Sequence, residues 1–280
     1  MGKILITGAT GNVGGAVIKY LPKHVTAVAG VRGVGKGKSI PFPEVVFDFA
    51  SPSTFETAFD GVKVLFLLRP PQLSDSGIFV PLLESCREKG VVHVVFLSVQ
   101  GADTQTMIPH YKIEQLILKS GLAYTFLRPA YFMENFTTFL RNDLIERSEI
   151  FLPAGKAKLS IISLDDVGKV AAEVLTHPGR YRNQAFDLTN DELFSFVEMA
   201  GQLSVILNRK ITYTSPNLFS FFLRKKKEGM PMALILVMIM LHFLPRFKKP
   251  PVLSKSVETI LGHRPELLKA FVLRNRDKLT

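Results

Sequence analysis

The sequence is poor in cysteine, with Cys86 the only one among 280 residues. A single cysteine cannot form a disulfide within the chain or supply a C-x-x-C metal site, so we expect no metal centre of that kind and a reducing compartment. A free cysteine is usually a packed core residue, which is our interpretation of Cys86. A nucleophilic thiol is the alternative.

The sequence also lacks a long apolar segment. Lys3 is followed at once by a strand-like run and a glycine loop, so we expect no signal peptide. The apolar run 230–244 contains Pro231 and His242 and is shorter than the ~20 residues that a membrane-spanning helix needs. We interpret this run as a buried helix, and we expect a cytoplasmic protein without stable membrane insertion.

Acidic residues are scarce in the last quarter of the chain. Residues 1–207 hold 20 basic and 20 acidic residues. Residues 208–280 hold 15 basic and 4 acidic residues, and so carry the whole net charge of +11. A solvated basic surface is the simplest interpretation, and an anionic partner is the alternative. Basic residues at 225–227 and 246–249 flank the apolar run, which also suits an interfacial helix. The basic residues are not interleaved with aromatic residues as in a nucleic-acid-binding module, so we expect no nucleic acid partner.

Short β-type apolar runs alternate with helical patterns along the first half of the sequence. The expected strands are 4–7, 25–31, 45–47, 62–68, 91–98 and 124–127, and the expected helices are 12–20, 54–59, 78–89 and 110–119. Strands that alternate with helices at short spacing indicate βαβ units with right-handed crossovers. The sequence therefore predicts an α/β fold with a doubly wound parallel sheet of the Rossmann type.

The pattern becomes less regular after residue 150. We expect a Rossmann domain at 1–150, with the strand-like runs 159–163 and 185–188 as candidates to complete its sheet. Residues 151–280 are expected to form a smaller, partly helical substrate domain that is basic from residue 208.

A glycine-rich loop directly follows the first expected strand. Gly8, Gly11 and Gly14 form a G-x-x-G-x-x-G pattern between a strand and a helix. In dinucleotide-binding folds such glycines allow a sharp turn, a close approach of the backbone to a pyrophosphate, and close packing of the helix. The helix N-terminus adds partial positive charge and free N–H donors. A tight turn without a ligand is the alternative; the residues we expect to bind the pyrophosphate are Gly8, Thr10, Gly11, Asn12 and Val13.

The residues after the second expected strand bear on the choice between NADP and NAD. An NAD site usually has an acidic residue about 20 positions after the glycines, but no acidic residue precedes Glu44. Arg32, Lys36 and Lys38 follow the strand instead, and a guanidinium at this point pairs well with a 2′-phosphate. We therefore predict NADP as the cofactor, with NAD possible. A surface role for Arg32, stacked on adenine, is the alternative.

Ligands of open α/β sheets bind outside the carboxyl ends of the strands. Asp48 and Phe49 follow the third strand, where adenine contacts are expected; a loop or capping role for Asp48 is the alternative. The residues that end the fourth and fifth strands are expected at the nicotinamide half of the site: Leu67, Leu68, Arg69, Ser98 and Val99.

The motifs GATGNVGG, VRG, FLSVQGAD, HYKIEQLILKSGLAYTFLRPAYFMENF and SIISLDDVGKVAAEVL together resemble the NmrA-like branch of the atypical short-chain dehydrogenases. The resemblance extends from Lys3 to about Leu188. It implies a Rossmann fold with a small C-terminal substrate domain, and a position near the nicotinamide for Pro129, Ala130 and Tyr131. The branch includes NAD(P)H-dependent quinone and azo-dye reductases, isoflavone-reductase-like enzymes and catalytically silent redox-sensing regulators.

The sequence departs from the wider superfamily at its proton relay, a Tyr-x-x-x-Lys pair. Tyr111 is followed four positions later by Gln115, and Lys112 is adjacent to Tyr111, so their side chains diverge by about 100° on a helix. His110 has a suitable ordinary pKa for a general acid. The catalytic candidates are therefore His110, Tyr111 and Lys112, with a cofactor contact or a helix start as the alternative for His110.

Three functions remain for comparison. The favoured one is an NADPH-dependent reductase, monomeric or homodimeric, that passes hydride to a small apolar acceptor such as a quinone or a conjugated carbonyl. The alternative is a silent NAD(P)-sensing regulator that binds a partner protein, favoured by the missing Tyr-x-x-x-Lys pair and the basic last quarter. A sugar-nucleotide epimerase is disfavoured because it needs that pair.

Overall fold

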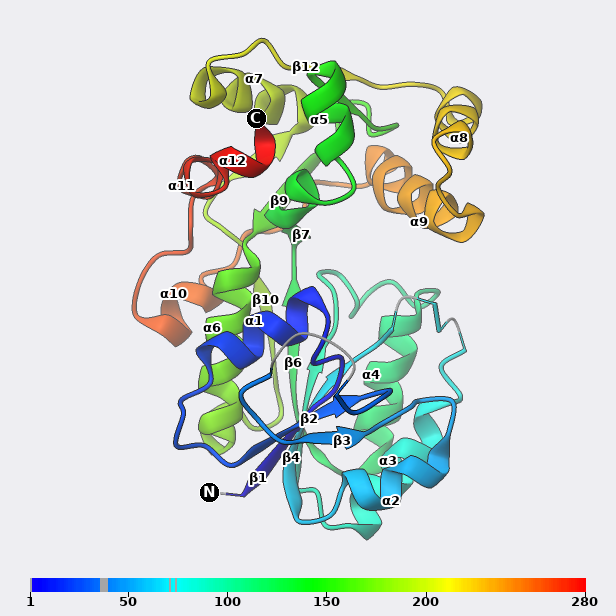
Figure 1. The fold of residues 1–280 in the computed structure, drawn as a ribbon, viewed down its shortest axis with the longest axis vertical. Coiled ribbons are helices and arrows are strands. Elements are labelled where there is room, and N and C mark those ends of the chain that lie inside the picture. The colour runs from blue at the N-terminus through cyan, green and yellow to red at the C-terminus, as the bar shows by residue number, and fades with distance from the viewer. Residues whose placement is uncertain (1, 36–39, 71, 74) are drawn as a thin grey trace. The chain divides into compact units, whose positions relative to one another are not determined.

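The computed structural model describes residues 2–35, 40–70, 72–73 and 75–280, and Figure 1 shows the course of the chain. The chain divides into two compact units. The first unit consists of Met1–Ala130, Leu164–Leu188 and Ser254–Arg264, and the second of Tyr131–Ser163, Thr189–Leu253 and Pro265–Thr280. The boundary expected at residue 150 differs from this division, because the first segment ends at Ala130 and two later segments belong to the first unit.

The first unit is built on a parallel sheet of seven strands in the order β10-β6-β5-β4-β1-β2-β3. Strand order reverses between β1 and β4, as in a doubly wound fold, so the predicted fold class is confirmed. The strands are β1 Lys3–Ile6, β2 Ala27–Val31, β3 Glu44–Val46, β4 Val62–Leu68, β5 His93–Leu97, β6 Ala123–Pro129 and β10 Gln184–Leu188.

One of the two runs expected to complete this sheet does so. β10 pairs in parallel with β6 from Gln184 to Leu188. The prediction for 159–163 is wrong, because β9 (Lys158–Ile162) pairs with β7 (Tyr131–Phe132) and β11 (Leu193–Ser195) in a separate sheet. Both runs have a strand-like apolar pattern, and only the tertiary pairing of their backbone groups distinguishes the two sheets.

Helices cover both faces of the seven-stranded sheet (Figure 1). On one face α2, α3 and α4 pack against an aromatic core, in which Phe47, after β3, lies between Phe49 and Phe55 at centroid distances of 5.0 and 5.3 Å. Cys86 lies fully buried in this core, as expected. The helices of this unit are α1 Asn12–Tyr20, α2 Phe55–Ala58, α3 Phe79–Glu88, α4 Pro109–Ser120, α6 Leu164–Thr176 and α10 Ser256–Leu261, with 3₁₀ turns η1 Pro52–Thr54 and η3 Pro178–Tyr181.

The second unit combines the β11-β9-β7 sheet with a two-stranded β12-β8 sheet and several helices. Phe196 is the centre of its aromatic core and contacts the rings of Tyr131, Tyr213 and His242 at 5.7 to 5.8 Å. The remaining elements are η2 Met133–Thr137, α5 Arg141–Arg147, β8 Glu149–Phe151, α7 Phe196–Leu207, β12 Thr212–Thr214, α8 Leu218–Lys227, α9 Met232–Phe243, η4 Leu244–Phe247, α11 Leu268–Arg274 and α12 Arg276–Leu279.

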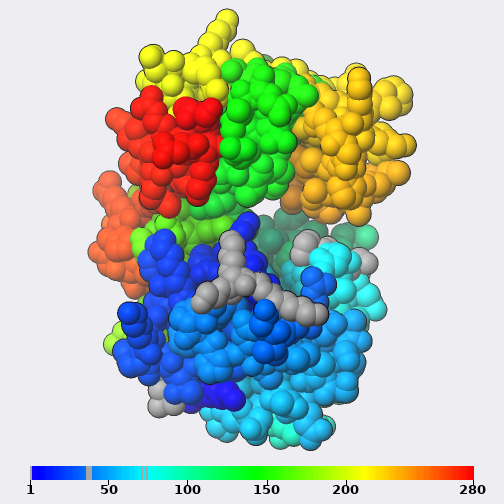
Figure 2. All heavy atoms as spheres, viewed as in Figure 1, coloured from blue at the N-terminus to red at the C-terminus, as the bar shows by residue number. Residues whose placement is uncertain are grey.

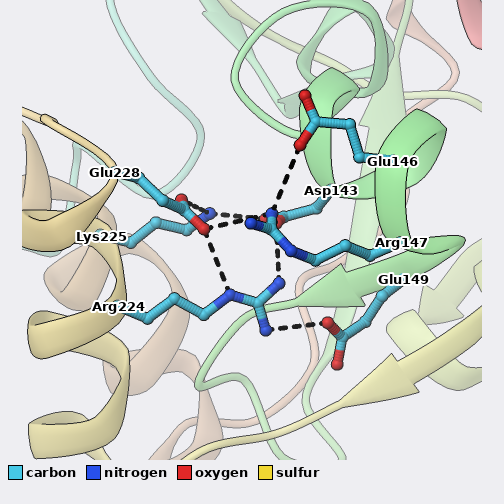
Figure 3. A network of polar contacts seen from close by, with 7 residues as sticks. All are labelled: Asp143, Glu146, Arg147, Glu149, Arg224, Lys225 and Glu228. Carbon is cyan, nitrogen blue, oxygen red and sulfur yellow. Dashed lines mark hydrogen bonds and ion pairs between the residues drawn. The ribbon is translucent and has the colours of Figure 1, made fainter.

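An ion-pair network joins α5 to α8 inside the second unit (Figure 3). The side chains of Asp143 and Lys225 are 1% and 2% exposed, and Oδ2 of the first lies 2.5 Å from Nζ of the second. Asp143 Oδ1 also accepts hydrogen bonds from Arg147 at 2.9 Å and Arg224 at 2.8 Å. Because the buried lysine has a carboxylate partner, its burial does not leave an isolated charge.

The run expected to be a buried helix forms α9, but most of its apolar side chains are exposed, so that expectation is wrong. Only Ile235, Met238 and His242 are buried, on one side of the helix. The spheres of this helix, orange in Figure 2, lie at the surface of the second unit. The exposed apolar residues of the helix are Met232, Leu234, Leu236, Val237, Met240 and Leu241. A run whose one polar residue is His242 does not indicate by its pattern which side is buried. Among the described residues, no helix is long and apolar enough to span a bilayer.

Candidate functional site

The predicted site begins at the carboxyl end of β1, where Thr7 joins β1 to β4. The Thr7 hydroxyl donates to the carbonyl of Phe66 and accepts from the N–H of Leu68, both at 2.9 Å. Thr7 is fully buried. These bonds fix the start of the glycine loop at the point where the strand order reverses, which is where open α/β sheets bind their ligands.

Two glycines determine the path of this loop. Gly8 has a φ of +64°, and a Cβ there would lie 2.5 Å from Leu68 Cδ2. At Gly14 a Cβ would lie 2.2 Å from the carbonyl oxygen of Gly8 and 2.9 Å from Ala9 Cα. Gly14 therefore allows α1 to pack closely against the loop that precedes it.

The N-terminus of α1 is open to a ligand. Gly11 is its N-cap and provides no side-chain cap, and the first turn contains no acidic residue. The Gly11 and Asn12 positions are exposed. The N-terminus of this nine-residue helix therefore offers both first-turn N–H donors and a partial positive charge that no acidic side chain in its first turn compensates. This combination suits the binding of a pyrophosphate.

Ser98 lies where β5 ends and is 1% exposed. Its backbone N–H donates to the carbonyl of Leu127 at 2.8 Å. Its Oγ has no hydrogen-bond partner among the residues that the structure describes. Buried hydroxyls are nearly always hydrogen-bonded, so this atom fits a ligand group at the same edge of the sheet as the glycine loop.

The end of β2 offers a cation to a ligand. Arg32 follows β2 directly and is exposed. Glu44, the nearest acidic residue in sequence, accepts a hydrogen bond from the N–H of Gly35 at 2.6 Å and so stabilises the loop after β2. The predicted contributions of Lys36 and Lys38 lie outside the described residues.

Asp48 and Phe49 have structural roles after β3. The Asp48 carboxylate accepts from the N–H of Ala50 at 3.0 Å, and the Asp48 N–H donates to Thr54 Oγ1 at 3.1 Å. Phe49 packs edge-on against Phe47. These contacts agree with the loop role that we held open for Asp48, and they leave the backbone of Phe49, rather than its ring, for an adenine contact.

Arg69, directly after β4, and His110, in the first turn of α4, lie close together. The Arg69 guanidinium donates to the carbonyls of Pro70, at 3.3 Å, and Leu73. The ring of His110 stacks on Phe96 of β5 at 6.1 Å. Burial, with a smaller contribution from the charge of Arg69, lowers the pKa of His110 to about 3. His110 is therefore a neutral imidazole near pH 7 and is poorly suited to act as a general acid there.

The other two catalytic candidates do not form a pair with His110. Tyr111 is half-buried and Lys112 is exposed, in keeping with the rotation between adjacent helical positions. Leu67 lies in the core, and Leu68 and Val99 are half-buried at the carboxyl edge. The structure thus brings His110 to this edge of the first unit but assembles no proton relay from these three residues.

A buried ion pair beneath the site was not predicted. Glu114, 1% exposed, accepts from Arg128 of β6 through both carboxylate oxygens, at 3.0 and 2.6 Å. The pair fixes α4, and hence His110, against the sheet. A sequence signal existed, because Glu114 shares the buried face of α4 with Ile113 and Ile117, where a carboxylate needs a partner.

The residues after β6 divide between the two units. The Pro129 carbonyl accepts from Gln100 N–H at 3.0 Å, and Ala130 N–H donates to the Leu188 carbonyl at 2.9 Å, which holds both at the carboxyl edge of the sheet. Tyr131 belongs to the second unit, where its hydroxyl lies 3.2 Å from Nε2 of His242.

Known proteins match this chain in sequence and in fold. The family model described as "NmrA-like family" matches residues 1–245. This chain belongs to the NmrA-like family. The prestalk A differentiation protein A of Dictyostelium discoideum is 30% identical over 96% of this chain and 90% of its own length. The NAD(P)H azoreductase of Xenophilus azovorans is 29% identical over 92% of this chain and 91% of its own length.

A solved structure agrees with the fold over the whole length. It is the NADPH-dependent quinone oxidoreductase of Escherichia coli in complex with NADPH, with a TM-score of 0.85 over 98% of this chain and 99% of that one. The two sequences are 23% identical, so this NmrA-like chain shares its fold with the quinone oxidoreductase. Among the described residues, no group of three or more His, Cys, Asp or Glu is arranged to hold a metal ion.

Proposed function

We propose that this chain is an NADPH-dependent oxidoreductase that transfers hydride to a small apolar acceptor such as a quinone or another conjugated carbonyl. The observation that carries the proposal is the uncapped N-terminus of α1, held at the reversal point of the sheet by Thr7, Gly8 and Gly14. The azoreductase and quinone oxidoreductase named above support the reaction class.

The residues that would hold the cofactor follow from the carboxyl edge of the sheet. The Gly11 N–H donates to the Gly8 carbonyl at 3.0 Å, so the backbone N–H groups of Asn12 and Val13 would bind the pyrophosphate, and Arg32 would bind the 2′-phosphate. Ser98 Oγ would hydrogen-bond a polar group of the nicotinamide half. NADPH, when bound, supplies the hydride. The neutral imidazole of His110 would orient a ligand through a hydrogen bond rather than transfer a proton, and a quinone acceptor needs little acid catalysis.

Oxidation of NADPH against a panel of quinones, enones and azo dyes tests this function. We expect turnover with at least one apolar quinone and a lower kcat/KM with NADH than with NADPH. Saturable NADPH binding combined with no turnover across the panel would contradict the reductase and leave the cofactor site intact.

The second candidate function is an NAD(P)-sensing regulator without catalysis. It is favoured by the low pKa of His110 and by the absence of a Tyr-x-x-x-Lys pair at Tyr111. A sensor must bind its partner differently with and without cofactor. Affinity capture from lysate with NADPH, with NADP⁺ and without either separates the candidates, because a reductase is not expected to retain a partner in a cofactor-dependent way.

A further inference from the structure

The second unit contains a basic groove that the proposed oxidoreductase activity does not use. Its volume is about 760 Å³, within the range of small-molecule sites. The loop from β8 to β9, the first turn of α7, the end of β12 and the η4 segment line it. The polar groups that line it are Lys156, Lys158, Tyr213, Ser215, Arg246 and Lys248.

Arg246 is held in place at this groove. Its guanidinium lies over the ring of Phe243, 5.0 Å from the centroid. Its Nε is so close to Gly155 that a Cβ there would lie 2.7 Å away, and Gly155 also has a φ of +56°. The Gly155 N–H donates to Ser215 Oγ at 2.9 Å, which fixes the loop against the end of β12. A guanidinium held in this way loses little rotamer freedom when it binds an anion.

Where the structure describes the chain, two of the cations that line the groove have no compensating carboxylate. No acidic residue is among the residues that line it. The Glu198 carboxylate lies 3.5 Å from Lys158 Nζ and also accepts from Ser195 N–H at 2.7 Å. Within the described part of the chain, Lys156 and Arg246 have no carboxylate partner.

We propose that this groove binds an organic phosphate or polyphosphate. A planar guanidinium binds two phosphate oxygens at once, and lysines add point charges around it. Tyr213 and Ser215 lie in the same lining, and the Tyr213 hydroxyl donates to the Leu152 carbonyl at 3.1 Å, so the cations supply the main contacts to the phosphate. The groove is larger than a single phosphate requires, so it has room for the organic part of the ligand. A free phosphate ester and the headgroup of an anionic phospholipid share this chemistry.

Calorimetric titration of the full chain with inorganic pyrophosphate, in saturating NADP⁺, tests the proposal. We expect saturable binding that the double variant Lys156→Gln, Arg246→Gln weakens by on the order of tenfold or more. The matched control is Lys226→Gln, Lys227→Gln, which removes the same charge from the exposed end of α8, outside the groove. The control should bind pyrophosphate as the parent chain does, and equal weakening in both variants would overturn the proposal.

Sedimentation with phosphatidylcholine vesicles, with and without phosphatidic acid, distinguishes the two sources of phosphate. The groove is assigned to a lipid headgroup if the parent chain binds vesicles only when they contain phosphatidic acid and if the groove variant, but not the control, loses this binding. Pyrophosphate binding without vesicle binding assigns it to a soluble phosphate. A poly-glutamate peptide that binds more tightly than pyrophosphate, or binding of neither phosphate probe, overturns the proposal. Unchanged melting temperatures and NADP⁺ binding show that both variants are folded.

Discussion

Gly14 and Gly15 are neighbours in α1 with opposite surroundings. A Cβ at Gly14 would lie 2.2 Å from the Gly8 carbonyl, whereas a Cβ at Gly15 meets nothing within 4 Å. We expect Gly14→Ala to displace the loop and weaken NADPH binding by at least on the order of tenfold, or 1.4 kcal/mol. Gly15→Ala should leave binding unchanged and stabilise the helix by about 0.5–1 kcal/mol. Calorimetry and urea unfolding measure the two effects, and an equal loss of binding in both variants would contradict the role given to the loop.

Arg32 determines the proposed preference for NADP. We expect Arg32→Gln to raise the Kd for NADPH by on the order of tenfold, because a hydrogen-bonded ion pair to the 2′-phosphate is lost. The Kd for NADH, which has no 2′-phosphate, should not change. Fluorescence titration with both nucleotides measures this, and Lys119→Gln, at the far end of α4, controls for the loss of one surface charge. Equal effects on NADPH and NADH would show that Arg32 acts elsewhere.

At the scale of the elements, α5 and α8 depend on one buried carboxylate. We expect Asp143→Ala to lower the free energy of unfolding by about 1.5–3 kcal/mol, because it removes the closer of the two carboxylates that the buried Lys225 contacts and leaves Glu228 at 2.9 Å. Glu146→Ala is the matched control in the same network (Figure 3). The Glu146 side chain is 61% exposed and 4.0 Å from Arg147, so its loss should cost less than about 1 kcal/mol. Urea unfolding measures both, and similar losses would contradict this account.

The elements also show where sequence patterns stop being informative. The βαβ alternation predicts most strands of the central sheet, because parallel strands buried on both faces form continuous apolar runs. The same pattern does not distinguish β9 from β10. The burial of Glu114 and Asp143 depends on partners in β6 and α8, and neither partner lies next to its carboxylate in the sequence.

At the scale of the whole molecule, two buried histidines and one half-buried histidine make stability depend on pH. Burial lowers the pKa of His93 and His242 to about 4 and that of His110 to about 3. The unfolded chain binds these protons below about pH 6.5, while the folded chain stays neutral. The contribution of these histidines to the free energy of unfolding is therefore fully present above pH 6.5, and it is lost progressively as the pH is lowered towards 4. Each histidine contributes up to about 1.4 kcal/mol per pH unit over this range.

His242 is suited to test this pH dependence. Its Nδ1–H donates to the Met238 carbonyl at 2.6 Å, so Nε2 accepts from the Tyr131 hydroxyl. We expect His242→Gln to reduce the slope of stability against pH between 6.5 and 4.5 by about one proton. His263→Gln, at an exposed position, should leave the slope as it is. Urea midpoints across this pH range measure both, and identical slopes for the two variants would contradict the neutral, buried state of His242.

The sequence by itself determined the fold class, the glycine loop and the cation after β2, because each depends on residues that are close together in the chain. Only the tertiary structure decided which strands share a sheet, that His110 is neutral, that one side of α9 is exposed and that Arg246 lies against Gly155. These features arise from burial and from contacts between distant segments. The free energy of such contacts depends on which groups are shielded from water. The folded chain as a whole determines which groups are shielded.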